Sequence, residues 1–188
     1  TRRSSDLPVI GRFQAGFEKG VADAGKKLGK DIQITSTYAG TFADASKGRA
    51  LASSMYQAGA DIIYHAAATT GQGIFQEAKA LNETGSKDKV WVIGVDRDQN
   101  EDGKYTTKDG KDDNLTLAST IKGVNIAVKK ISDLALEDKF PGGEHLTYGL
   151  KDGGVDLTTE ALSDQAKTAV KEAKEQIISG DVKVPDQP

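Results

Sequence analysis

Apolar and polar positions repeat along this chain with two different periods. Over residues 13–28 the apolar side chains recur every three or four positions, which is the spacing of one face of a helix. The same spacing predicts helices over 44–57, 71–81, 121–136 and 163–178. Residues 31–38 alternate apolar and polar and predict a strand. The runs 60–67 and 89–95 are short, apolar and bounded by turn residues, which is typical of buried parallel strands, and 115–119 and 145–150 are weaker strand candidates.

This alternation of helices and strands predicts an α/β fold, a parallel sheet with helices on both faces. Ligands of such sheets bind beyond the carboxyl ends of the strands. We therefore expect a site to be built from the residues directly after each predicted strand, which are 39–42, 66–73 and 96–98.

Three of these strand ends carry residues that suit a ligand. Asp96 could accept two hydroxyl hydrogen bonds from the vicinal diol of a sugar, or it could simply form a turn. Gly71 and Gly73 would let backbone N–H groups approach a ligand at a helix start, or they form a tight turn. Gln76 stands where a dinucleotide fingerprint needs its third glycine. Phe42 could stack on a planar base or pack under the next helix.

Composition narrows the function classes. The 188 residues are 37% hydrophobic and 28% charged, with a formal net charge of −3, which argues against a nucleic-acid partner. The absence of cysteine excludes disulfides, thiolate metal sites and cysteine nucleophiles. The N-terminal residues lack the apolar run of a signal peptide. The only histidines, His65 and His145, have no serine elbow motif or metal spacing beside them, so we expect a binding protein and not an enzyme.

One loop has part of a calcium-binding pattern. Asp98, Asn100, Asp102 and Gly103 follow the first half of an EF-hand loop. A predicted strand precedes the loop where an EF-hand has a helix, and Asp109 stands at the position of the last glutamate. Aspartate and glycine are also common in loops that bind no metal, because both residues favour turns. We therefore expect no metal and no cofactor here.

Several motifs together resemble a known family. The motifs are Pro8-Val-Ile-Gly-Arg-Phe-Gln-Ala-Gly-Phe17, Tyr38-Ala-Gly-Thr-Phe-Ala-Asp44, Gly59-Ala-Asp-Ile-Ile63, Val92-Ile-Gly-Val-Asp-Arg-Asp-Gln99 and Ser119-Thr-Ile-Lys122. Their order and spacing are similar to those of the basic membrane protein family, surface lipoproteins that serve as purine nucleoside-binding components of ABC importers. The resemblance runs from about Leu7 to the end of the chain.

The resemblance implies a type I periplasmic-binding fold whose two lobes close on a purine nucleoside. Asp96 would bind ribose hydroxyls, and Lys122, on the helix after the crossover, would reach the same sugar. Phe42 would be one of two aromatics around the base, and backbone near Thr70 and Gly71 would line the pocket. An ABC permease and ATPase would be the partners of an extracytoplasmic protein, held at the membrane through a lipid anchor that this chain lacks.

The chain also departs from the family. Residues 67–71 read Ala-Ala-Thr-Thr-Gly in place of a Gly-Gly-Thr-Gly-like turn. An early Asp-x-Ser-Phe-Asn-like motif and the lipid-anchoring cysteine have no counterpart. We therefore expect residues 1–114 to form the C-terminal lobe without its first strand, 115–143 to belong to the N-terminal lobe, and 144–188 to return. The alternatives are a ligand-sensing regulator of the same fold, an enzyme on a flavodoxin-like sheet, and a chain that binds nothing alone.

Overall fold

A four-stranded sheet organises the molecule. The computed structural model describes residues 8–85 and 88–187. The strand order is β1-β2-β5-β6, in which β1, β2 and β5 run parallel and β6 runs antiparallel to β5. The sheet is therefore mixed and mostly parallel, which confirms the α/β class. Its strands are β1 (Ile62–Tyr64), β2 (Trp91–Asp96), β5 (Thr116–Lys122) and β6 (Val155–Leu157).

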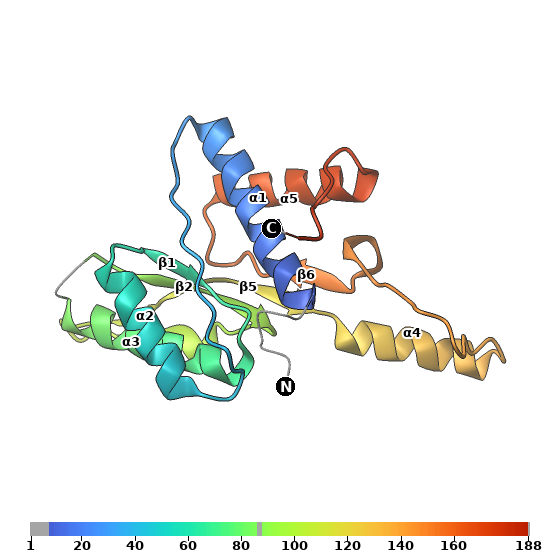
Figure 1. Ribbon diagram of the computed structural model, residues 1–188, viewed down its shortest axis with the longest axis horizontal. Coiled ribbons are helices and arrows are strands. Elements are labelled where there is room, and N and C mark those ends of the chain that lie inside the picture. Colours follow the sequence, from blue (N-terminus) through green and yellow to red (C-terminus); the bar gives the residue numbers. More distant parts are fainter. Residues whose placement is uncertain (1–7, 86–87, 188) are drawn as a thin grey trace.

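Helices cover both faces of this sheet. In Figure 1, α2 (Ala45–Gln57) and α3 (Ala68–Thr84) lie below the sheet, while α1 (Pro8–Leu28) and α5 (Asp164–Ser179) lie above it. Two of these helices begin as their sequences predict. Asp44 accepts from the Lys47 N–H at the start of α2, and Ser163 accepts from the Ala166 N–H at the start of α5.

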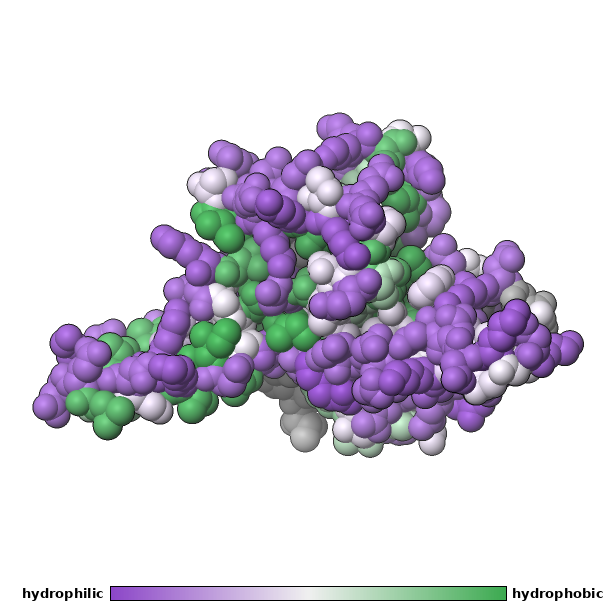
Figure 2. Space-filling view, turned by 180° about the vertical axis from the view of Figure 1, so that it is seen from behind, coloured by the Kyte–Doolittle hydropathy of each residue, from purple (hydrophilic) through white to green (hydrophobic). Residues whose placement is uncertain are grey.

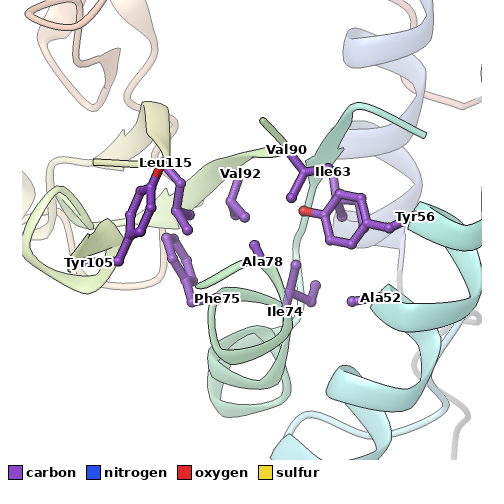
Figure 3. Packing of buried hydrophobic residues seen from close by; sticks show 10 residues of the cluster. All are labelled: Ala52, Tyr56, Ile63, Ile74, Phe75, Ala78, Val90, Val92, Tyr105 and Leu115. Carbon is purple, nitrogen blue, oxygen red and sulfur yellow. The ribbon is translucent and has the colours of Figure 1, made fainter. Parts of the chain in front are cut away.

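The main core lies between the α2–α3 pair and the sheet. Figure 3 shows apolar side chains from both helices meeting those of β1 and β2. Val92 and Leu115 are fully buried, and burial of such a side chain stabilises the fold by about 1.5–3 kcal/mol. Both tyrosine hydroxyls of this core have partners: Tyr56 donates to the Trp91 carbonyl at 3.0 Å, and Tyr105 donates to the Asp113 carboxylate at 2.7 Å. The cluster consists of Ala52, Tyr56, Ile63, Ile74, Phe75, Ala78, Val90, Val92, Tyr105 and Leu115.

The opposite face of the sheet is covered more thinly. Tyr64 points to this side, and its ring lies 5.0 Å from that of Phe17 and 6.5 Å from that of Phe13, both on α1. Beyond the sheet, α4 (Val124–Leu136) extends away from the rest of the molecule in Figure 1. Figure 2 shows hydrophobic patches on this arm, where Val128 is 60% and Leu136 85% exposed.

Two predicted strands are wrong. Residues 31–38 form an extended connection from α1 to α2, visible in Figure 1, and pair with no strand among the described residues. Ile32 and Ile34 remain exposed there, because the alternation needs a neighbouring strand that this fold does not place beside it. Residues 145–150 are not a strand either. The edge strand lies further along, at β6.

The loop 96–114 is more ordered than its polar composition predicts. It contains a short 3₁₀ turn, η2 (Glu101–Gly103), and a hairpin of β3 (Lys104–Thr106) and β4 (Asp112–Asn114). A second 3₁₀ turn, η3 (Leu150–Asp152), precedes β6. The pairing of β5 with β2 puts residues 116–122 in the same sheet as the preceding strands. The division into lobes at 115 and 144 stays a prediction.

Candidate functional site

The carboxyl ends of β2 and β5 bring two charged side chains together. Asp96 is the last residue of β2 and Lys122 the last of β5, and the two strands are parallel neighbours. Lys122 Nζ lies 2.8 Å from Asp96 Oδ1, with the two side chains 53% and 47% exposed. Lys122 thus ends a strand and does not lie on the following helix as expected, because β5 continues to residue 122 before α4 begins.

This ion pair contributes little to folding. A half-exposed pair is worth at most about 1 kcal/mol because water screens both charges. A ligand hydroxyl could therefore bind to Asp96 or Lys122 at small cost to the fold. The carboxylate can accept from the hydrogen of a sugar hydroxyl, and the ammonium can donate to its oxygen.

Asp96 has an unusual backbone conformation. Its φ is 68°, in the left-handed region that residues other than glycine rarely adopt. The Arg97 N–H donates to the Val95 carbonyl at 2.8 Å, so Asp96 is the central residue of a tight three-residue turn. Such conformations persist where the surrounding structure imposes them, and they concentrate at functional sites. The turn directs the Asp96 carboxylate toward Lys122.

The loop that carries Phe42 is joined to the start of α3 by hydrogen bonds. The Thr70 hydroxyl donates to the Thr41 carbonyl at 3.2 Å and accepts from the Asp44 N–H at 3.1 Å. The Thr70 N–H donates to the Phe42 carbonyl at 3.2 Å. The structure thus places Phe42, half-buried, beside Thr70. The buried Thr70 hydroxyl and its backbone N–H both have partners within the fold, so Thr70 holds the Phe42 loop against the start of α3.

Gly71 is explained by packing. A Cβ at residue 71 would lie 2.2 Å from Cε1 of His65, so no larger residue fits against that ring. Sequence reasoning treated this glycine as a possible ligand-approach site and missed the histidine behind it. His65 is 4% exposed, and burial lowers its pKa to about 4. Its Nε2 lies 3.1 Å from Oε1 of Gln99.

Gln99 is the residue that sequence reasoning overlooked. It is 5% exposed although it lies in a polar loop three residues after Asp96. Its place at the end of the Val92–Gln99 motif could have drawn attention to it, but a glutamine in a polar loop is normally expected to be solvent-exposed. Ser119, which is fully buried on β5, binds the Gln99 backbone N–H at 3.0 Å.

The loop residues of the partial EF-hand pattern are engaged with the protein itself. Asp98 accepts from the Asn100 N–H at 2.9 Å, which makes an ordinary aspartate turn. Asp102 accepts from Arg97 at 2.6 Å and from Gln99 at 2.9 Å. Over residues 8–85 and 88–187, no group of three or more His, Cys, Asp or Glu residues is arranged to hold a metal ion.

Comparison with known proteins identifies the family. Residues 4–188 match the model of the Bmp family, described as ABC transporter substrate-binding protein PnrA-like. The chain belongs to this family. Relatives include the ABC transporter nucleoside-binding protein BmpA of Lactococcus lactis, 49% identical, with 98% of this chain and 54% of that protein covered.

Further relatives also cover most of this chain. Basic membrane protein A of Borreliella burgdorferi is 33% identical, with 94% of this chain and 48% of that protein covered. A CD4+ T-cell-stimulating antigen of Listeria monocytogenes is 47% identical, with 96% and 50% covered. The chain thus spans about half the length of the curated relatives it matches.

Solved structures support the fold. An ABC transporter solute-binding protein from Aeropyrum pernix superposes with a TM-score of 0.78 at 26% identity, over 96% of this chain and 55% of that one. A transcriptional activator of the comK gene from Bacillus halodurans gives 0.61 at 22% identity, over 77% and 46%, which shows a shared fold alone. No helix in the described part of the chain is long and apolar enough to cross a bilayer.

Proposed function

We propose that this chain is the part of an extracytoplasmic ABC importer component that binds the ribose of a purine nucleoside, without transforming it. The observation that carries the proposal is the Asp96–Lys122 pair at the carboxyl ends of neighbouring parallel strands, 2.8 Å apart and half-exposed. The relative from Lactococcus lactis, named a nucleoside-binding protein, supports the choice of ligand class.

Different residues would bind the two parts of a nucleoside, the polar ribose and the planar base. Asp96 would accept hydrogen bonds from the ribose hydroxyls, and Lys122 would donate to a ribose oxygen. The charged partners make these bonds stronger than neutral ones. The ring of Phe42 would stack on the base, worth about 1–3 kcal/mol. Thr70 and Gly71 would border the site with backbone.

The partners follow from the proposed role. A permease and an ATPase would receive the ligand, and a lipid anchor outside these residues would hold the protein at the membrane. Because the chain spans about half of its relatives' length, a second lobe contributed by further sequence would complete the cleft around the base.

A thermal-shift titration tests the proposal. The ligands are guanosine, inosine, adenosine, cytidine and free ribose. A ligand at 100 times its dissociation constant stabilises the protein by about 2.7 kcal/mol. We expect stabilisation by the purine nucleosides, and loss of that stabilisation in Asp96→Asn.

The matched control is Glu101→Gln. It removes a carboxylate from another exposed ion pair, with Lys104 at 2.6 Å, and should leave the titration unchanged. Stabilisation that survives in Asp96→Asn would contradict the assignment of the ribose site. If the 188-residue chain shows no shift, the same titration on a protein of the relatives' length decides between an incomplete cleft and a different ligand.

A further inference from the structure

Gln99 uses every polar group it has. The side-chain oxygen Oε1 accepts from the Val95 N–H at 2.8 Å, and Nε2 donates to Asp102 at 2.9 Å. The backbone N–H donates to the Ser119 hydroxyl at 3.0 Å, and the backbone carbonyl accepts from the Thr116 hydroxyl at 3.0 Å. A buried amide with this many partners has a single orientation, because any rotation would leave polar atoms unpaired.

These bonds hold the turn that carries Asp96. The Val95 N–H donates to the Gln99 side-chain oxygen, and the Val95 carbonyl accepts from the Arg97 N–H. Asp96, between them, is left-handed with φ 68°, a conformation that the surroundings have to impose. Gly94 lets the amide come close, since a Cβ there would lie 2.7 Å from Gln99 Oε1.

The same oxygen connects the turn to the neighbouring strand end. Because Gln99 Oε1 can only accept, the proton of neutral His65 lies on Nε2, 3.1 Å away. His65 Nδ1 is then an unprotonated acceptor, and it has no hydrogen-bond partner within the described residues. The ring packs against Gly71 at the start of α3 and edge-on to Phe75, with centroids 5.9 Å apart. Gln99 thus connects the end of β2 to the residues that follow β1.

We propose that Gln99 is a positioning residue for ligand recognition. It does not touch the ligand, but its side-chain oxygen keeps the Asp96 turn in the conformation that aims the carboxylate at the ribose hydroxyls. The inference rests on the proposed function for the identity of the ligand. Without the Gln99 acceptor, Asp96 relaxes toward ordinary backbone angles, and its carboxylate leaves the position beside Lys122.

The test uses Gln99→Met, which keeps the length of the side chain and removes its hydrogen bonds. We expect the dissociation constant for guanosine to rise by about tenfold or more, the scale on which small misplacements act. The loss should be much smaller for 2′,3′-dideoxyguanosine, which lacks the diol that Asp96 would bind. Equal losses for both nucleosides, or unchanged guanosine binding, would overturn the proposal.

A conservative exchange provides a rescue. In Gln99→Glu one carboxylate oxygen can still accept from Val95, but the other faces the Asp102 carboxylate, so guanosine binding should weaken. Adding Asp102→Asn supplies an amide donor to that oxygen and should restore most of the affinity. Failure of the double variant to improve on Gln99→Glu would contradict the role assigned to these bonds.

A measurement without ligand separates this proposal from the proposed function. In Gln99→Met, the Val95 and Arg97 amides should exchange about tenfold faster or more, which is the effect of losing a hydrogen bond worth about 1.4 kcal/mol. The Asp96 Cα chemical shift should move toward extended values. Tyr56→Phe, which removes the remote bond to Trp91, is the control for general destabilisation and should leave both readouts unchanged. If no nucleoside binds, either to this chain or to a protein of the relatives' length, but these readouts change as expected, the ligand assignment is wrong and the positioning of Asp96 by Gln99 stands. Unchanged readouts overturn the positioning.

Discussion

Replacement of Ala68 by glycine should stabilise the protein. Ala68 is the first residue of α3, it is exposed, and its φ is 46°. A residue with a Cβ in this region costs about 1–2 kcal/mol because Cβ approaches the following carbonyl oxygen. Glycine removes that cost but adds about 0.4–1 kcal/mol of conformational entropy to the unfolded chain. The expected net effect of Ala68→Gly is a gain of roughly 0–1.5 kcal/mol.

The neighbouring alanine is a control for the entropy. Ala67 has φ −134°, outside the left-handed region, so Ala67→Gly removes no left-handed cost and should destabilise by about 0.4–1 kcal/mol. Because both substitutions add the same glycine to the unfolded chain, the entropy cancels in their difference. The two variants should therefore differ by about 1–2 kcal/mol in favour of Ala68→Gly.

Urea unfolding measures this difference. Trp91, the single tryptophan, reports the transition by its fluorescence from within β2. If the free energy of unfolding falls with urea concentration at the same slope in both variants, their unfolded states are comparable. If Ala68→Gly is no more stable than Ala67→Gly, residue 68 is not left-handed in solution.

Three further outcomes follow from the core and from His65. Leu115→Ala should lower the free energy of unfolding by about 2.7–5 kcal/mol, since Leu115 is fully buried. Leu136→Ala, at an 85% exposed residue, should change it little. Equal urea midpoints for the two variants would contradict this prediction. Gly71→Ala should destabilise strongly by clashing with His65, while Gly20→Ala, with open space around it, should not destabilise; thermal melts compare them. The pKa of His65 is about 4 in the folded protein against 6.5 in the unfolded chain, so the unfolded chain binds the proton more readily. The free energy of unfolding should therefore fall by roughly 3 kcal/mol as the pH drops from about 6.5 to 4. Urea titrations at several pH values should show a smaller fall in His65→Gln.

Much of the fold follows from local pattern. The helix periods place α1, α2, α3 and α5 within a few residues of their observed bounds, because a helix closes its hydrogen bonds within one segment. The strand ending at Asp96 was also predictable, since a strongly apolar run in an α/β chain has to be buried in the sheet. The strands that failed are those whose existence depends on a partner. Residues 31–38 have the strand pattern without a neighbour, and β6, a short exposed edge strand, pairs with β5 without a clear pattern of its own.

The sequence by itself determined that Asp96 would stand at a strand end, but it predicted Lys122 on a helix, whereas Lys122 is the last residue of β5. Only the tertiary structure decided that the two side chains meet, that Asp96 is left-handed, and that a buried amide from Gln99 lies behind it. The physical reason is that register and close packing join residues far apart in the chain. His65 and Gln99 are separated by 34 positions, and no local period encodes a hydrogen bond at that distance.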